Sequence, residues 1–266
     1  MSNHRSSWLA GLLASALLFM LARPVAAADV HVVVSGGMAP ALKALAADFE
    51  KSSGHHVIAE PGPSLGTTPN AIPLRMDRGE AIDVLLMVRD GIAPLIAKGQ
   101  VDEASVTDLA RSKIAMAVRQ GASVPDIGSV ESFRRTLLQA KSVAWSDSAS
   151  GVYLRSELFN RLGIESEMAA KGRTVPGTPV GEAVAAGQYE LGFQQYSELL
   201  AVSGIHIVGL IPDELQKVTM YSAVIPKSAK AAAAGRALIA FLSSARAAQA
   251  IKASGLEPVV RQRAGP

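Results

Sequence analysis

The 266-residue sequence contains no cysteine. This absence excludes a disulfide framework and any metal site built from thiolates. The sequence also lacks the His-Glu-x-x-His spacing of zinc peptidases, the Gly-x-Ser-x-Gly turn of serine hydrolases and the glycine-rich loops that bind nucleotides. We therefore expect neither a metal nor a cofactor.

Net charge and long hydrophobic runs are also scarce. The formal net charge is +3, and it falls to +1 for residues 29–266 because Arg5 and Arg23 lie in the N-terminal segment. So small a charge gives no case for binding nucleic acid or a membrane surface. The apolar run at 8–21 is too short to span a bilayer comfortably.

The first 28 residues have the pattern of a secretory signal. A basic start with Arg5 precedes the apolar run at 8–21, and three alanines ending at Ala28 follow it. This pattern is typical of a signal peptide that is removed during export. We predict cleavage after Ala28, a periplasmic location and a loose tail at 261–266, with an uncleaved membrane anchor as the alternative.

The rest of the sequence alternates between strand-like and helix-like patterns in two consecutive units, which predicts an α/β fold. In the first unit we predict strands at 30–34, 55–59, 81–88 and 113–119, helices at 39–51, 71–79 and 92–99, and a turn at 108–111. In the second unit we predict strands at 142–145, 190–196, 205–211 and 218–225, and helices at 129–140, 152–162, 179–187, 197–200, 230–242 and 245–254.

Two strand-to-helix turns suit a small anion. The turn Ser35-Gly36-Gly37 precedes the first helix, whose N-terminus carries about half a positive charge and unpaired backbone N–H groups. The second unit repeats this design at 146–151, where Ser150 and Gly151 open a helix. Plain N-capping by the serines is the alternative for the second turn.

The loop at 60–70 contains three prolines, two glycines and three hydroxyl residues. Such an irregular loop indicates a functional segment. Ser64 and Thr67 can donate to an anion from it. Arg75 and Arg78 on the following helix are either solvated or, for at least one of them, able to reach the loop.

Polar residues also mark the second unit. Thr178 is predicted to cap a helix that has Pro179 at its first position. Gln194 and Gln195 are polar within a strand that should be buried. They are either residues of an edge strand or amide donors at the C-terminal end of a strand, where α/β proteins place their ligands.

Several short motifs occur in a characteristic order. They are Ser35-Gly-Gly, the helix Ala-Leu-Lys-Ala-Leu-Ala-Ala-Asp-Phe, Ser64, Ile82-Asp-Val, Ser150-Gly-Val-Tyr and Leu191-Gly-Phe. In this order the sequence resembles the periplasmic molybdate-binding proteins of ABC importers over about residues 29–258. The resemblance implies a two-lobe type II periplasmic binding protein fold, with a ligand cleft between the lobes. It implies one lobe from 29–112 and 221–260 and another from 113–220, with crossings near 112–120 and 216–225.

The resemblance also implies the oxyanion donors. They would be Ser35, Ser64, the backbone at Ser150 and the backbone at Gly177 or Thr178. The binding tyrosine of that family falls on Gln195 here, and the loop after Ser64 is longer by about four residues. Both differences affect the pocket and favour a larger anion, such as a carboxylate.

A second resemblance points to an enzyme. Ser35-Gly-Gly, Gly62-Pro-Ser, the segment 146–153 and Gly192-Phe-Gln-Gln are similar to bacterial aconitate isomerases, which interconvert trans- and cis-aconitate. That reaction needs a base to move a proton along an allyl system while the carboxylates are held. Arg75 would hold a carboxylate. Tyr153, Tyr196 and Asp147 are the candidate proton carriers, and the sequence does not choose among them.

Two functions therefore stay open, because both share one fold. The first is a monomeric receptor that delivers a small anion, an oxyanion or an organic polycarboxylate, to the permease of an ABC importer. The second is aconitate isomerase. The expected ligand-binding residues are common to both: Ser35, Gly36, Gly37, Ser64, Thr67, Arg75, Ser150, Gly151, Gly177, Thr178 and Gln195.

Overall fold

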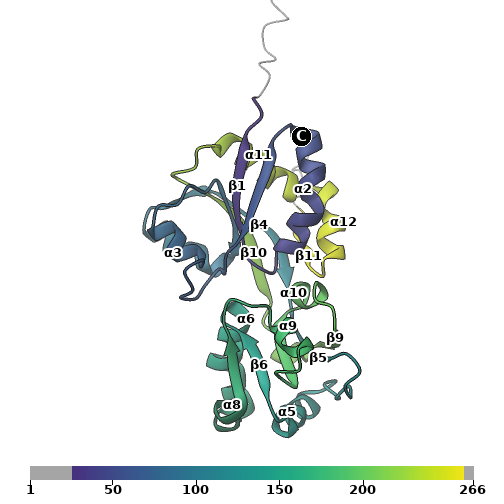
Figure 1. The fold of residues 1–266 in the computed structure, drawn as a ribbon. Helices are drawn as coiled ribbons and strands as arrows, with labels where there is room; N and C mark the ends of the chain where they lie inside the picture. The colour runs from purple at the N-terminus through teal and green to yellow at the C-terminus, as the bar shows by residue number, and fades with distance from the viewer. Residues whose placement is uncertain (1–25, 261–266) are drawn as a thin grey trace, which may run out of the picture.

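The computed structural model describes residues 26–260, which form two α/β lobes, each built around its own sheet (Figure 1). All but the last three residues of the predicted signal segment lie outside the described residues, and so does the predicted tail at 261–266. Within 26–260, no helix is long and apolar enough to cross a membrane.

The first lobe contains a six-stranded sheet in the order β11-β4-β10-β3-β1-β2. The strands β1, β2 and β3 are parallel, whereas β10 runs antiparallel to both β3 and β4. Their bounds are β1 Asp29–Val34, β2 His56–Pro61, β3 Val84–Val88, β4 Val101–Ser112, β10 Thr219–Pro226 and β11 Glu257–Pro258.

The second lobe contains a five-stranded sheet in the order β7-β6-β8-β5-β9. The strands β6, β7 and β8 are parallel, and β5 is antiparallel to its neighbours β8 and β9. Their bounds are β5 Ile114–Arg119, β6 Val143–Ser146, β7 Gly172–Val175, β8 Leu191–Gln195 and β9 Ile205–Leu210.

Helices cover both sheets. In the first lobe these are α2 Ala39–Ser53, α3 Ile72–Asp77, η1 Arg89–Gly91, α4 Ile92–Ala97, α11 Ala232–Leu242 and α12 Ala245–Ala253. In the second lobe they are α5 Val130–Gln139, α6 Ala149–Tyr153, the π-helical turn η2 Leu154–Leu158, α7 Phe159–Leu162, α8 Glu165–Lys171, α9 Val180–Ala185, α10 Tyr196–Leu200 and η3 Asp213–Leu215. The sequence patterns did not predict β7, α8 or β11.

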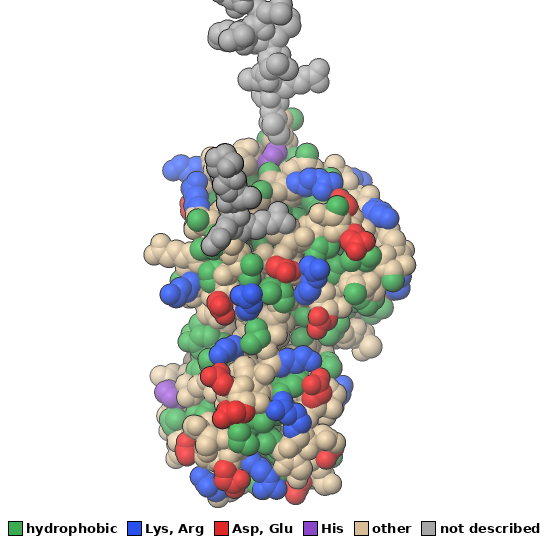
Figure 2. Space-filling model, turned by 180° about the vertical axis from the view of Figure 1, so that it is seen from behind, with side chains coloured by type: hydrophobic (Ala, Val, Ile, Leu, Met, Phe, Trp, Pro, Cys, Tyr) green, Lys and Arg blue, Asp and Glu red, His purple; other side chains and the backbone are tan. Residues whose placement is uncertain are grey.

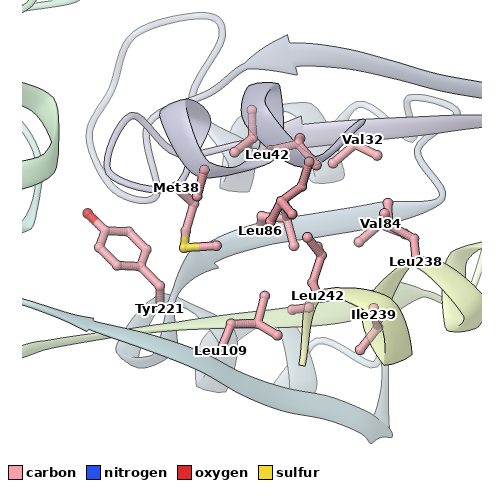
Figure 3. Packing of buried hydrophobic residues seen from close by; sticks show 14 of the residues in the cluster. Val32, Met38, Leu42, Val84, Leu86, Leu109, Tyr221, Leu238, Ile239 and Leu242 are labelled. Carbon is pink, nitrogen blue, oxygen red and sulfur yellow. The ribbon is translucent and has the colours of Figure 1, made fainter. Parts of the chain in front are cut away.

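The strand β3 shows why the first sheet needs helices on both faces. All five of its residues are buried. Leu86 packs with α2, α11 and α12 on one face, and Leu85 packs with α3 and α4 on the other. Figure 3 shows the first of these clusters, with Tyr221 of β10 at its border. A continuous apolar strand is the expected sequence of such a doubly covered position.

The chain crosses between the lobes twice. Ser112 ends β4 in the first sheet and Ile114 begins β5 in the second, so Lys113 alone joins them. The segment between β9 and β10 returns the chain to the first sheet, where β10 begins at Thr219.

The predicted turn at 108–111 is wrong, because these residues belong to the long strand β4. Leu109 and Ala110 are buried, and Asp108 points to the other side, where it accepts hydrogen bonds from Ser222 at 2.7 Å and Arg89 at 3.0 Å. Pairing with β10 and β11 satisfies the backbone of β4 on both edges. Tertiary pairing therefore overrides the polar, turn-like local sequence.

We expect Asp83→Ala to destabilise the fold by about 3 kcal/mol. The Asp83 carboxylate is 3% exposed and accepts backbone N–H groups from His31 at 2.9 Å and from Lys230 and Ala231 at 2.8 Å. Alanine would leave these three donors without their acceptor. The free energy of unfolding in urea measures the effect.

The matched control is Asp213→Ala. The Asp213 side chain is 84% exposed and pairs with Lys113 at 3.0 Å. Exposed ion pairs contribute little, so we expect a change within about 0.5 kcal/mol. Equal losses in the two variants would contradict the structural role of Asp83.

Candidate functional site

A cavity of ≈ 170 Å³ lies between the lobes. It is bordered by the turns that follow β1, β2, β6 and β7 and by one residue of α10. Parallel strands bring their C-terminal ends to one edge of a sheet, and ligands of open α/β folds bind there. The lining residues are Ser35, Gly36, Pro61, Gly62, Pro63, Asn70, Ser146, Asp147, Ser148, Gly177, Thr178, Pro179 and Glu198.

The turn after β1 supplies donors from the first lobe. Ser35 is buried, and its backbone N–H donates a hydrogen bond to the Leu86 carbonyl at 2.8 Å. Within residues 26–260, the N–H groups of Gly36 and Gly37 have no backbone acceptor, and both precede the 15-residue helix α2. These N–H groups and the Ser35 hydroxyl can face an anion.

Tyr221 of β10 supports this turn from behind. Its hydroxyl lies against Gly37, where a β-carbon would not fit, and it hydrogen-bonds with Ser35. Burial raises the pKa of Tyr221 well above 10, and the nearby charge of Glu198 raises it further. Tyr221 therefore stays protonated and orients the Ser35 hydroxyl. Figure 3 shows its ring beside Met38, with the hydroxyl pointing away from the apolar cluster.

The most unusual group in the cavity is the carboxyl of Glu198, in the first turn of α10. It belongs to the second lobe but lies against Gly36 of the first, at a point where a β-carbon on Gly36 would clash with it. Burial raises the pKa of Glu198 from 4.5 to about 7, and the charge of Asp147 adds to this rise. Hydrogen bonds with the Gln194 side chain and the Gln195 backbone offset only part of it. A carboxyl that titrates near neutral pH can accept and return a proton.

Sequence reasoning missed Glu198. The segment 197–200 was assigned only as a short helix. The available signal was an acid placed just after the C-terminal end of a buried strand that ends in Gln194-Gln195. That signal is weak, because an acid in the first turn of a helix usually only stabilises the helix dipole.

Asp147 was predicted as a candidate proton carrier, and the structure places it in the cavity. It lies at the turn after β6. A β-carbon added to Gly66 would lie 3.6 Å from the Asp147 backbone oxygen, so the loop after β2 reaches across to the second lobe here. The two lobes therefore approach each other on both sides of this cavity, at Gly36 with Glu198 and at Gly66 with Asp147.

The two glutamines are buried in β8, a central strand, which excludes the edge-strand alternative. The side-chain oxygen of Gln194 accepts from the Val180 N–H at 2.9 Å, and the side-chain NH₂ of Gln195 donates to Thr219 Oγ1 at 2.9 Å. Gln195 therefore ties the second lobe to β10 of the first and does not line the cavity. Its side-chain oxygen is buried without a partner among the described residues.

Several predicted donors shape the turns and do not face the cavity. Ser64 is fully buried, and its hydroxyl accepts from the Val88 N–H at 2.9 Å. Ser150 exchanges a hydrogen bond with Ser146 at 3.0 Å, and Gly151 packs on the Ser146 carbonyl with no space for a β-carbon. Neither Ser64 nor Ser150 lines the cavity.

The turn after β7 does border the cavity. Gly177, in a left-handed conformation with φ 68°, and Thr178 both line it. The prediction that Thr178 caps α9 is wrong by one residue, because Pro179 occupies the N-cap position. The Val180 N–H, which a cap would otherwise hold, bonds to Gln194, so Thr178 is left to face the cavity.

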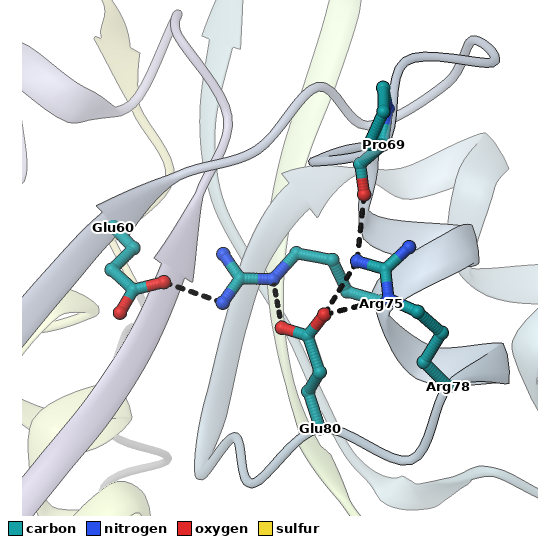
Figure 4. Close-up of polar contacts among 5 residues, drawn as sticks. All are labelled: Glu60, Pro69, Arg75, Arg78 and Glu80. Carbon is teal, nitrogen blue, oxygen red and sulfur yellow. Dashed lines mark hydrogen bonds and ion pairs between the residues drawn. The ribbon is translucent and has the colours of Figure 1, made fainter.

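Arg75 lies outside the cavity. Its guanidinium donates to Glu60 at 2.5 Å and Glu80 at 2.6 Å, and its side chain is only 12% exposed (Figure 4). Arg78 binds the same Glu80 and donates to the Pro69 carbonyl at 2.7 Å. Arg78 therefore holds the 61–70 loop in place, and Arg75 holds β2 to the segment after α3. Neither arginine is free to clamp a carboxylate.

The two predicted tyrosines also lie elsewhere. The Tyr153 hydroxyl donates to the Leu215 carbonyl at 2.7 Å and accepts from Arg161 at 3.0 Å, inside the core of the second lobe. Tyr196 packs beside Ala115 and Leu199 on the other face of the same sheet. Neither lines the cavity that holds Glu198, and Tyr153 instead borders a separate cavity of ≈ 220 Å³ together with Leu65 and Val88 of the first lobe. Asp147 is therefore the predicted proton carrier that the structure brings to the cleft.

Thr67 lines an adjoining cavity of ≈ 350 Å³, which shares Ser146 and Asp147 with the first. Among residues 26–260, no group of three or more His, Cys, Asp or Glu side chains is arranged to hold a metal ion. Figure 2 shows acidic and basic side chains interspersed over the back of both lobes, without a large area of one sign.

Two sheets joined by crossing strands, with anion-friendly turns facing a cleft, define a solute-binding fold. The chain belongs to the family of bacterial extracellular solute-binding proteins, whose family model matches residues 30–257.

Individual relatives differ in function. An aconitate isomerase from a Pseudomonas species is 47% identical over 254 residues, which cover 96% of each chain. The molybdate-binding protein ModA of Azotobacter vinelandii is 28% identical over 246 residues, 89% of this chain and 92% of that one. A solved structure of the periplasmic molybdate-binding protein of Azotobacter vinelandii superimposes with a TM-score of 0.69 at 22% identity, covering 88% of this chain and 100% of the other.

We expect Glu198→Gln to change the pH dependence of stability. Because the folded-state pKa is raised from 4.5 to about 7, the folded protein retains a proton that the unfolded chain releases, and Glu198 lowers stability as pH rises through this interval. The variant lacks this loss, so its melting temperature should match the wild type below about pH 4.5 and exceed it above about pH 7. Differential scanning calorimetry at pH 4.5 and pH 8 measures the difference.

The control for this prediction is Glu182→Gln, which removes an exposed carboxyl from α9. Its effect on the melting temperature should be small at both pH values. A Glu198→Gln difference that is the same at both pH values would contradict the raised pKa.

We expect Arg78→Ala to loosen the 61–70 loop, because the variant loses the hydrogen bonds to Pro69 and Glu80. Limited proteolysis followed by mass spectrometry should detect faster cleavage within 61–70. Arg135→Ala, which removes an exposed arginine from α5, is the control and should be cleaved as the wild type is. Unchanged cleavage of the loop in Arg78→Ala would disprove the positioning role.

Proposed function

We propose that this protein interconverts cis- and trans-aconitate, with Glu198 as the group that carries the proton. The main support for this proposal is the Glu198 carboxyl, which lines the interlobe cavity and whose pKa is raised to about 7. A protein that only binds and releases an anion has no need of such a group, and a second carboxylate beside it opposes anion binding. The 47% identity with an aconitate isomerase over nearly the whole chain supports the same reaction.

The proposed chemistry is a proton shift along an allyl system. The ionised Glu198 removes a proton from the methylene carbon, and the electron pair moves into the adjacent double-bond system and onto a carboxylate. The protonated Glu198 then returns the proton to the former vinyl carbon, so that the double bond has moved and its geometry has changed. Atoms and charge balance without a further reactant, and one group with a pKa near neutral pH serves both steps.

Donors around the cavity would stabilise the intermediate. Negative charge develops on a substrate carboxylate when the proton leaves, and fixed N–H and O–H groups lower the energy of that charge. The Ser35 hydroxyl, oriented by Tyr221, and the N–H groups of Gly36 and Gly37 are such donors on the first lobe. Thr178 adds a hydroxyl from the second.

A receptor for an ABC importer is the second candidate. The turns around the cavity offer mainly neutral donors, which suit a small oxyanion, and the chain is 28% identical to a molybdate-binding ModA protein. In this case the protein would act as a monomer and hand its anion to a permease. For either function we propose export to the periplasm with removal of residues 1–28, on the pattern of the N-terminal sequence.

The decisive assay follows the absorbance of purified protein with trans-aconitate and identifies the product by NMR. We expect conversion to cis-aconitate, with kcat/KM rising through about pH 7 as Glu198 ionises. In Glu198→Gln we expect kcat to fall at least about a hundredfold, while trans-aconitate still binds.

Glu131→Gln serves as the control, because Glu131 is exposed on α5 and lines neither the cleft cavity nor the cavity next to it. It should retain wild-type rates. A folded wild-type protein without isomerase activity would refute the proposal. A rise in melting temperature with molybdate, and none with trans-aconitate, would favour the receptor instead.

A further inference from the structure

Arg155 lines a second cavity, which has no role in the chemistry proposed for Glu198. This cavity of ≈ 350 Å³ adjoins the first one and shares Ser146 and Asp147 with it. The loop after β2 forms one side, with Thr67 and Thr68. Arg155, from the π-helical turn η2, forms another.

The first cavity is too small and has the wrong charge for a whole tricarboxylate. At ≈ 170 Å³ it lies below the roughly 300–1,000 Å³ of typical small-molecule sites, whereas the two cavities together fall within that range. Its titratable side chains are two carboxyls, Asp147 and Glu198, and it contains no lysine or arginine. A polyanion in this cavity therefore needs a cation from a neighbouring one. Lys43 lines a third cavity, of ≈ 680 Å³, beside Gly36 and Glu198, but that cavity shares neither Ser146 nor Asp147 with the other two.

Arg155 meets this need. It is exposed at the mouth of the second cavity, and no carboxylate among residues 26–260 pairs with it. The acid two positions further on, Glu157, pairs with Lys217 at 3.0 Å instead. By contrast, Arg75 and Arg78 are occupied by Glu80. Guanidinium groups bind carboxylates in a bidentate geometry, so an unpaired arginine at a cavity is suited to an anionic ligand.

The surroundings of Arg155 add hydroxyl donors. Thr68 Oγ1 is buried and has no partner within the described part of the chain. Thr174 also lines the cavity, and its hydroxyl is fixed by the Trp145 N–H at 2.9 Å. A π-helical turn interrupts the helix where Arg155 lies, and such turns are frequent at functional sites.

We propose that Arg155 binds the carboxymethyl carboxylate of a tricarboxylate in this second cavity and so selects tricarboxylates over smaller anions. The proposal rests on the proposed isomerase function and extends it by assigning a specificity residue. Arg155 would hold one end of the ligand on the second lobe while the allyl system lies next to Glu198 in the first cavity.

The test compares Arg155→Gln and Arg155→Lys with the wild type. With trans-aconitate, we expect Arg155→Gln to raise KM and the calorimetric Kd by roughly 10- to 100-fold, because a charged hydrogen-bonded pair is lost. We expect a smaller rise for Arg155→Lys, which keeps the charge but not the bidentate geometry. The value of kcat should change less than about threefold, since Arg155 does not carry the proton. Arg135→Gln, on the exposed face of α5, is the control.

A second ligand separates a direct contact from a general loss of charge. In mesaconate a methyl group replaces the carboxymethyl group of trans-aconitate. We expect mesaconate to bind the wild type and Arg155→Gln with the same Kd. Equal weakening of both ligands, or an unchanged Kd for trans-aconitate, would refute the role of Arg155.

The outcomes for the two proposals are distinguishable. If the wild type converts trans-aconitate and Arg155→Gln does so with an unchanged KM, the Arg155 proposal fails and the proposed function stands. If the wild type binds trans-aconitate through Arg155 without converting it, the isomerase fails and the tricarboxylate site stands. If the wild type neither binds nor converts it, both fail.

Discussion

The contact between Glu198 and Gly36 is the constraint on which the site depends. A carboxyl from the second lobe can reach the first only because Gly36 has no β-carbon to occupy the same space. The carboxyl is partly shielded from water between the lobes, and this desolvation raises its pKa to about 7. A wider separation would return the group to solvent and to its ordinary value. Lobe geometry and acid–base chemistry are thus set by the same contact.

The rest of the fold maintains that contact. Gln195 bonds to Thr219 across the lobes, and Gln194 bonds to both Glu198 and the start of α9, so the end of β8 is rigid where α10 begins. On the opposite lobe Tyr221 fixes Ser35 from behind. These polar groups are buried where apolar ones would stabilise more. They hold Glu198 and Ser35, the groups proposed to act on the substrate, in place at some cost in stability, as is common for functional sites.

The sequence predicts the position of a residue well where that position depends only on the neighbouring residues in the chain. Ser35-Gly36-Gly37 is predicted to border a ligand because a strand ends and a long helix begins there. In the structure Ser35 and Gly36 line the cavity, and Gly37 lies against Tyr221. Sequence reasoning failed where the role depends on a partner far along the chain. Arg75 was predicted to hold a ligand carboxylate, but it pairs with Glu60 and Glu80. Residues 108–111 were predicted as a turn, but they belong to β4, which pairs with β10 and β11. Glu198 was missed because its pKa arises from a contact with residue 36.

Charge balance links the two proposed roles. A bound tricarboxylate brings negative charge toward Glu198 and would push this group toward its protonated form, whereas a base must be ionised. In the proposed arrangement Arg155 neutralises one carboxylate at the far side of Asp147, so less of the ligand's charge opposes ionisation of Glu198. A receptor that only binds an oxyanion needs neither an arginine without a carboxylate partner nor a carboxyl whose pKa lies near neutral pH. Arg155 and Glu198 together suit a ligand that carries several carboxylates and can also give up a proton.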